Sequence, residues 1–198
     1  VLAEHDLKLV SGWFSGQLLS RSAEEEIIAI EDHLQLLKKG GSNVMVYCEV
    51  TGAIHGKQAI PLSHRPTMQA AEWEQFGKQL TQVADYCLSQ GVRLAYHHHM
   101  GTVVETSDDI DLLMQHTGDS LGLLLDSGHI TYANGDPLAV VVKHGKRIVH
   151  VHTKDVRLDV LKDAKNRNLS FLDAVLNGVF TVPGDGDIDY KAIFTALR

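Results

Sequence analysis

The sequence predicts an α/β fold built on a parallel sheet. Short apolar, β-rich runs alternate with longer amphipathic runs along the chain, which is the order of repeated βα units. The 198 residues are 44% hydrophobic and 22% charged, a composition typical of a globular protein with a sizeable core. Ionisable side chains follow the ends of the apolar runs. Two architectures share this order, an open doubly wound sheet and a (β/α)8 barrel.

Strands are expected where apolar, β-rich residues run on, and helices where apolar residues recur at helical spacing. The expected strands are 7–14, 44–50, 92–97, 121–126, 147–152 and a short one at 179–182. The expected helices are 22–39, 67–90, 107–116, 137–145, 170–177 and a last one after Asp189. These elements make about six βα units.

Capping residues predict where several helices begin. Ser22 and Glu25 form a capping box at the start of the first helix. Ser107 is the expected N-cap of the third helix, with acidic residues in its first turn. Asp136 is expected to cap the fourth helix, with Pro137 at its first position.

The open doubly wound sheet lacks its usual sequence signature. Such a sheet normally carries a glycine-rich phosphate-binding turn after its first strand. No G-x-G-x-x-G or P-loop spacing follows any expected strand, and the "GDG" at 184–186 comes late, after a proline. Nothing therefore indicates a nucleotide site.

Polar or ionisable side chains lie at five strand ends. The expected strands end at or near Trp13, Glu49, His97, Asp126 and His152. In a parallel barrel these ends converge on one mouth, where the chemistry of such barrels is found. The pattern favours the barrel and predicts an active site at that mouth.

Asp126 and the histidines near it are candidates for a cation site. A carboxylate at the end of an apolar run is costly to bury unless it is paired or binds a cation; a loop cap is the alternative. His129 either points into the same mouth or is an ordinary lone histidine. His150 and His152 share a strand face, and His152 is the better placed for a metal. The alternative is a pair of satisfied core histidines.

The same two-residue period sorts the triplet His97, His98 and His99. His97 and His99 share one face of the strand and its extension, and His98 points the other way. If Tyr96 packs against the helices, His97 faces the barrel interior. Glu105 lies further along, in the loop before the next helix, where a solvated acid is expected rather than part of the site.

Imidazole and carboxylate ligands together suit Zn, Mn, Co or Fe. The sequence has no H-E-x-x-H helix and no cluster of cysteines, which argues against protease and structural zinc sites. Glu49 is a candidate acid, base or hydroxyl-binding group, with a strand-end salt bridge as the alternative. Trp13 is expected either to pack or to stack on a sugar.

Charge and hydropathy exclude several partners. The net charge is -7 and no basic block stands out, so nucleic acid is not an expected partner. No apolar run approaches the roughly 18 residues of a membrane span. The start of the chain does not read as a signal peptide, and its two cysteines lie far apart. A cytoplasmic location is expected.

Three stretches carry a resemblance to a known family. "LAYHHHMGTVVET", "LLLDSGHITYANGDPLAVVVKHGKRIVHVHTKDVR" and "FTVPGDGDIDYKAIFTAL" resemble the inosose (2-keto-myo-inositol) dehydratases. These belong to a wider group of xylose isomerase-like TIM-barrel sugar isomerases and epimerases. The resemblance implies that residues 1–198 form a single, partial TIM-barrel domain, an internal piece of a protein of about 250–300 residues. Open sheet edges then predict a homo-oligomer.

The resemblance also implies a divalent metal (Mn, Co, Zn or Mg) held at the strand ends. The aspartate and histidine ligands of the group fall on Asp126 and His152. Its first glutamate falls on His97, so either His97 replaces it as ligand or His99 or Glu105 does. The last glutamate ligand of the group normally lies on a strand after a segment like 189–198.

The implied activity is the metal-dependent elimination of water from a keto-inositol, a lyase step of inositol catabolism with a small keto-polyol as substrate. Candidate acid and base groups are His99, His129, Lys154 and Glu49, with no assignment among them. The alternatives are a sugar isomerase or epimerase acting through an enediolate, and an inactive truncated homologue.

Overall fold

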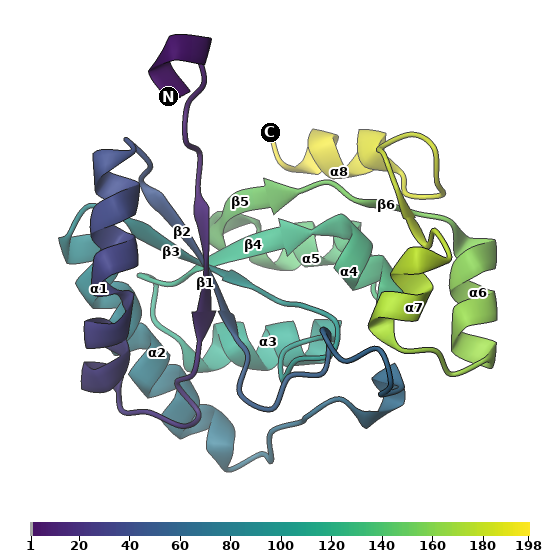
Figure 1. Cartoon of the computed structure of the whole chain (residues 1–198), viewed down its shortest axis with the longest axis horizontal. Helices are drawn as coiled ribbons and strands as arrows, with labels where there is room; N and C mark the ends of the chain where they lie inside the picture. The colour runs from purple at the N-terminus through teal and green to yellow at the C-terminus, as the bar shows by residue number, and fades with distance from the viewer. Residues whose placement is uncertain (1) are drawn as a thin grey trace.

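Five parallel strands form one curved sheet (Figure 1). The computed structural model describes residues 2–198. The strands are β1 Gly12–Gly16, β2 Val44–Glu49, β3 Arg93–His97, β4 Gly122–Asp126 and β5 Ile148–His152. They lie side by side in chain order, and every neighbouring pair is parallel. This is the arrangement expected for part of a (β/α)8 barrel.

The larger helices cover one face of this sheet. The helices are α1 Ala23–Lys39, α2 Glu72–Ser89, α3 Ser107–His116, α4 Ser127–Tyr132, α5 Pro137–His144, α6 Leu158–Asn166, α7 Phe171–Leu176 and α8 Tyr190–Ala196. Short 3-10 helices span Leu2–His5, Leu62–His64 and Gly145–Arg147.

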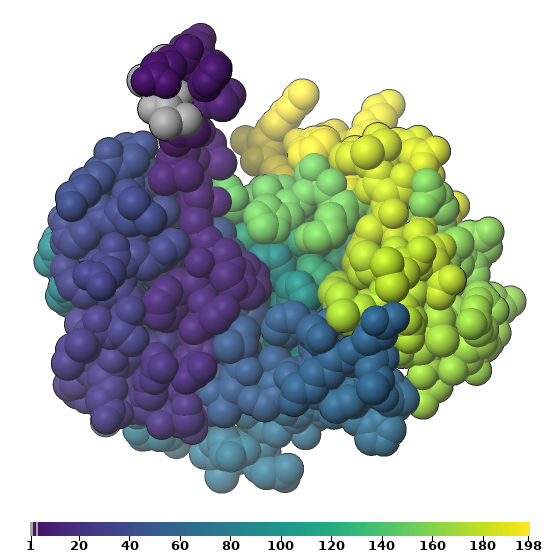
Figure 2. Space-filling view, in the orientation of Figure 1, coloured from purple at the N-terminus to yellow at the C-terminus, as the bar shows by residue number. Residues whose placement is uncertain are grey.

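In Figure 2 the surface is hollowed between the purple β1 segment and the yellow-green C-terminal segments. No helix among residues 2–198 has the length and apolar character to cross a membrane.

The two faces of the sheet bury different side chains. Tyr47 and Tyr96 belong to the large core between the sheet and the helices. Val46, Ala95 and Leu124 form a separate small cluster on the inner face. Because side chains alternate along a strand, the outward position of Tyr96 turns His97 inward, as the sequence predicted.

The expected sixth strand does not join the parallel sheet. The segment expected at 179–182 is reduced to β7 Phe180–Thr181, which pairs antiparallel with β6 Asp155–Val156. The chain between them forms α6 and α7, which pack with this strand pair on a second core that includes Met100 and Tyr132. The parallel sheet therefore has five strands in the described chain, and the expectation of a sixth was wrong.

Most helix starts agree with the capping prediction. The Ser22–Glu25 capping box is present, and Asp136 caps α5 ahead of Pro137. For α3 the cap is Thr106 and not Ser107. The Thr106 hydroxyl accepts the backbone N–H of Asp109, whose carboxylate accepts the N–H of Thr106 in return. Asp109, three residues after Thr106, completes a capping box and thereby fixes where α3 begins.

Two element starts differ from the prediction. Helix α2 begins at Glu72 instead of residue 67, and the Glu72 carboxylate accepts the backbone N–H of Gln69 ahead of it. Strand β1 begins at Gly12 instead of residue 7, because only Gly12–Gly16 pair with β2.

Candidate metal centre

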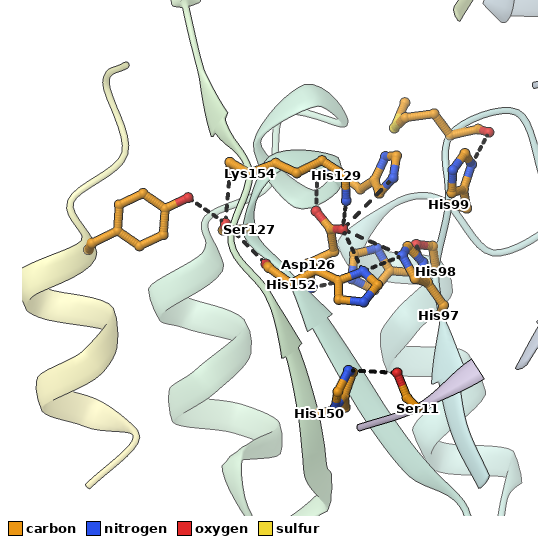
Figure 3. Close-up of polar contacts among 12 residues, drawn as sticks. Ser11, His97, His98, His99, Asp126, Ser127, His129, His150, His152 and Lys154 are labelled. Carbon is orange, nitrogen blue, oxygen red and sulfur yellow. Dashed lines mark hydrogen bonds and ion pairs between the residues drawn. The ribbon is translucent and has the colours of Figure 1, made fainter. Parts of the chain in front are cut away.

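Asp126, at the end of β4, lies at the centre of a cluster of ionisable side chains (Figure 3). Its carboxylate is fully buried. Around Oδ2 lie His97 Nε2 at 3.4 Å, His152 Nδ1 at 3.5 Å, His129 Nε2 at 3.9 Å, and the Lys154 ammonium group in direct contact. We call these five residues the Asp126 cluster. It unites the three predicted metal ligands with two of the four predicted acid–base groups.

The register of the strands brings these residues together. Strand β4 lies between β3, which ends at His97, and β5, which ends at His152. A β-bulge between Leu123 and Leu124 shifts the pairing, so that His150 lies opposite Leu124 and His152 opposite Asp126. Without that shift, Val151 would lie opposite Asp126.

His129 comes to the cluster through the start of α4. Asp126 is the N-cap of this helix, and its Oδ1 accepts the backbone N–H of His129 at 3.0 Å. His129 is 1% exposed, and neither of its ring nitrogens has a hydrogen-bond partner within residues 2–198. A buried, unpartnered imidazole is costly unless something binds it.

Three side chains are close enough to share one ion. The candidate ligand atoms of His97, Asp126 and His129 all lie within 4.8 Å of one another, and all three residues are buried. A metal ion bound by imidazole nitrogens and a carboxylate oxygen matches this donor set.

The protonation states also suit a cation. Burial lowers the pKa of His97 and His129, which keeps both imidazoles neutral. Burial alone would raise the pKa of Asp126, but the facing histidines and Lys154 hold it well below its usual range. Metal ligation needs neutral imidazole and ionised carboxylate.

The tautomer of His97 adds an argument from geometry. Its Nδ1 lies 2.5 Å from the backbone oxygen of His98. A carbonyl oxygen only accepts, so Nδ1 carries the proton and Nε2 presents a lone pair. That lone pair lies 3.2 Å from His152 Nδ1, which can donate to it, and 3.4 Å from Asp126 Oδ2, so it can also bind a cation that the carboxylate shares. The residues therefore fit a divalent metal.

His98 and His99 lie outside the Asp126 cluster. His98 is buried on the helix-facing side, where its Nε2 accepts the backbone N–H of Asp126 at 3.3 Å. The ring centre of His99 lies 4.1 Å from that of His129, and its Nδ1 is 2.9 Å from the backbone oxygen of Met100. Burial lowers the pKa of His99 to about 3. His99 therefore flanks the cluster as a neutral imidazole.

Glu49, the fourth predicted acid–base group, is placed apart from the cluster. It has the strand parity of Tyr47, on the helix-facing side, and burial raises its pKa. Its oxygens accept the backbone N–H groups of Leu18 at 2.6 Å, Leu19 at 3.3 Å and Thr51 at 2.7 Å. None of its hydrogen bonds or ion pairs within the described chain reaches Asp126.

Glu105 is not the solvated acid that the sequence suggested. It is 8% exposed, and its carboxylate accepts the backbone N–H of Gly101 at 2.6 Å and lies 3.5 Å from Arg65 Nε. Burial raises its pKa to about 7. It lines a separate cavity of about 350 Å³ together with Tyr132 and Lys165.

Trp13 and Ser127 complete the surroundings. The partly exposed Trp13 ring lies edge-on to His97 and His99, with centroid distances of 5.4 and 6.0 Å. The Ser127 hydroxyl lies 3.0 Å from the backbone oxygen of Lys154 and 2.9 Å from the Tyr190 hydroxyl. Sequence reasoning missed this serine, although it directly follows Asp126 in the "DSGH" segment.

The comparisons with known proteins agree with this geometry. A family model described as "Xylose isomerase-like TIM barrel" matches residues 1–198. The chain belongs to this family. Membership confirms the predicted fold class and identifies the five-stranded sheet as part of the wall of a xylose isomerase-like TIM barrel.

Two curated relatives cover almost the whole chain. The rhizopine catabolism protein MocC of Rhizobium meliloti is 49% identical over 197 residues, which are 100% of this chain and 61% of the relative. The inosose dehydratase of Clostridium tetani is 41% identical over 194 residues, 97% of this chain and 65% of the relative. This TIM-barrel chain thus spans a little less than two thirds of the length of these relatives.

A solved structure supports the fold. The structure of the IolI protein with a binding zinc atom matches 99% of this chain and 66% of its own, with a TM-score of 0.62 and 22% identity. At that identity the likeness concerns the fold alone.

Proposed function

We propose that this chain carries the metal centre of a metal-dependent dehydratase that eliminates water from a keto-inositol. The observation that carries the proposal is the Asp126 cluster, in which the buried, neutral imidazoles of His97 and His129 lie beside an ionised carboxylate. The 41% identity to an enzyme named inosose dehydratase supports the substrate class.

The metal is proposed to be held by Asp126, by His97, and by His129 or His152. Nitrogen and oxygen donors together favour Mn, Co or Zn over Mg. When bound, such an ion supplies Lewis acidity that polarises a ketone and makes the neighbouring C–H more acidic.

His99 is the proposed base. Its Nδ1 lies 2.9 Å from the backbone oxygen of Met100, so Nδ1 carries the proton and Nε2 has a free lone pair. His99 lies beside the cluster rather than on Asp126, and so keeps its lone pair for a substrate proton.

Lys154 is the proposed acid. Its side chain is 35% exposed and its ammonium group contacts the buried Asp126 carboxylate, so it lies between Asp126 and solvent. An ammonium group there can bind a hydroxyl and give it a proton. Glu49 has no assigned step, because its oxygens already accept backbone N–H groups.

The proposed reaction has a simple balance. His99 removes the proton from the carbon next to the ketone, and the electron pair forms an enediolate. The enediolate oxygen then re-forms the C=O group, and a C=C bond forms to the following carbon as the C–O bond of its hydroxyl breaks. The proton from Lys154 completes the departing water. His99 afterwards gives its proton to solvent, and Lys154 regains one from solvent. The remaining enol becomes a diketone by moving one proton from oxygen to carbon.

The first test is the dependence of substrate consumption on metal and on Asp126. Chelator-treated protein should consume 2-keto-myo-inositol only after Mn²⁺, Co²⁺ or Zn²⁺ is added, and Asp126→Asn should not consume it. Asp119→Asn, which changes an exposed aspartate in the turn before β4, should behave like the unchanged protein. Metal-independent consumption, or full activity of Asp126→Asn, would contradict the proposal.

The remaining proposals concern the context of the protein. We propose that residues 1–198 form one partial barrel domain, that the chain associates with copies of itself, and that its partner is a small keto-polyol rather than nucleic acid. Both cysteines, Cys48 and Cys87, are buried and free, which suits the proposed cytoplasmic location.

A further inference from the structure

Asp155 directly follows Lys154 in the chain. It is 0% exposed. Its Oδ1 accepts the backbone N–H groups of Val156 at 2.8 Å and Ile188 at 3.0 Å. Its Oδ2 accepts those of Gly184 at 2.8 Å and Gly186 at 3.2 Å. One carboxylate thus binds four backbone donors, three of them in the 184–188 loop.

The fit between this loop and the carboxylate leaves no room for a side chain. A Cβ at Gly186 would overlap Oδ1 of Asp155 and the backbone oxygen of Val156. The "GDG" sequence therefore has a local explanation. Its second glycine lets the loop backbone lie directly against the buried carboxylate.

The backbone of Lys154 is fixed from the other side as well. Its carbonyl oxygen accepts the Ser127 hydroxyl, which contacts Tyr190, the first residue of α8 after the loop (Figure 3). A Cβ at Gly128 would overlap Cβ of Lys154, so α4 packs tightly on the lysine stem. The Lys154 carbonyl is thus held by the Ser127 hydroxyl, and the next residue along the chain, Asp155, holds the 184–188 loop.

We infer that Asp155 is a positioning residue, whose buried carboxylate holds the 184–188 loop and thereby fixes the direction in which Lys154 presents its ammonium group to Asp126. The role of Lys154 in turnover rests on the proposed function. The claim that Asp155 fixes the direction of the Lys154 side chain does not rest on it, because that claim concerns only where the lysine lies. A carboxylate suits the task because it accepts on both oxygens and carries no proton that would oppose the N–H donors.

The test uses two readouts on the Asp155→Asn variant. The first is the rate at which an acylating reagent labels Lys154, followed by mass spectrometry of peptides and normalised to the exposed Lys39. The introduced amide would point an NH2 group at loop donors, so the loop should detach and Lys154 should be labelled severalfold faster. Asp185→Asn makes the same chemical change in the same loop, at a carboxylate that contacts Arg157 and Thr181, and should leave the labelling unchanged.

Gly186→Ala is the second route to the same displacement, since it pushes the loop away while keeping the carboxylate. It should also accelerate the labelling of Lys154, and it serves if Asp155→Asn does not fold. Unchanged labelling in a folded Asp155→Asn or Gly186→Ala protein would overturn the inference, whatever the reaction of the enzyme. So would equal acceleration in Asp185→Asn.

The second readout is a double-mutant cycle, in which kcat and KM are measured for Asp155→Asn, for Lys154→Met and for the protein that carries both changes. Asp155→Asn should lower kcat for the keto-inositol roughly 10- to 100-fold with little change in KM, as expected for a displaced catalytic group. In the Lys154→Met background it should lower kcat no further, because its effect passes through the lysine. Equal losses in both backgrounds would show a general structural role. An inactive unchanged protein would count against the proposed function, and the labelling result would still decide the inference.

Discussion

Three consecutive histidines at the end of β3 have three different environments. His97 faces the barrel interior and Asp126, His98 accepts the backbone N–H of Asp126 from the helix side, and His99 lies against His129. The two-residue period predicted that His97 and His98 would point apart. The contact of His99 with His129 depends on the turn after Asp126, which no strand pattern reveals.

His97→Ala should lower the affinity for Zn²⁺ by more than about 10-fold. Even the loss of a group that only hydrogen-bonds to a metal ligand commonly lowers metal affinity by about that factor, and His97 is proposed to be a ligand itself. His98→Gln is the matched control. It keeps an acceptor for the Asp126 N–H and removes no proposed ligand, so it should retain the metal. Equilibrium dialysis followed by metal analysis measures both. Equal zinc affinity of the His97→Ala and unchanged proteins would remove His97 from the ligand set.

Glu105 should give the stability of the protein a distinct pH dependence. Burial raises its pKa from 4.5 to about 7, so the folded state binds this proton more tightly than the unfolded state. The free energy of unfolding should therefore fall as the pH rises from 4.5 to 7, with Arg65 and Lys165 limiting the loss and Asp109 adding to it.

Glu105→Gln should remove that part of the pH dependence while keeping an acceptor for Gly101. Urea unfolding at several pH values, with chelator present, should show the variant gaining stability relative to the unchanged protein as the pH rises. Asp108→Asn controls for the loss of an exposed acid in the same segment. Parallel profiles for Glu105→Gln and the unchanged protein would mean that Glu105 ionises normally.

At the scale of elements, the sequence predicted best what local rules decide. Capping residues and helical spacing located α1, α3 and α5 to within a residue or two. Helix α4, "SGHITY", was missed because six residues are too few to show a helical period. Helix α6, "LDVLKDAKN", was missed although its apolar residues do recur at helical spacing. Helix α6 buries only Leu161 and Ala164, and the antiparallel β6–β7 pair rests on contacts between distant residues.

The Gly77→Ala variant tests how tightly α2 packs on α3. Alanine normally favours a helix over glycine by up to about 1 kcal/mol. Here a Cβ would overlap the backbone oxygen of His116, and overpacking of this kind typically costs about 1–3 kcal/mol. Because backbone cannot move aside like a flexible side chain, Gly77→Ala should lower the free energy of unfolding. Gly56→Ala, at an exposed turn with nothing within 4 Å of the new Cβ, should not. A stabilised Gly77→Ala protein would show that the two helices separate easily.

At the scale of the whole molecule, the convergence of strand ends predicted where the site lies but not which residues form it. Asp126, His97 and His152 followed from the end of each apolar run. Glu49 satisfied the same rule, yet its strand parity turns it to the helix side. The β-bulge that brings His152 opposite Asp126 depends on the pairing of β4 with β5, which a single sequence does not contain.

The open sheet predicts association. Within residues 2–198, β1 and β5 each pair on one side only, and unpaired edges invite strand pairing between copies. Light scattering of the purified chain should give a mass of at least two copies. A single-copy mass at high concentration would contradict this expectation.

The mass of the reaction product tests the central claim most directly. Purified protein loaded with Mn²⁺, Co²⁺ or Zn²⁺ and given 2-keto-myo-inositol should form a product lighter by one water, and Asp126→Asn should form none. A product of unchanged mass would identify a sugar isomerase or epimerase instead. No product from the metal-loaded protein would contradict catalysis by this chain.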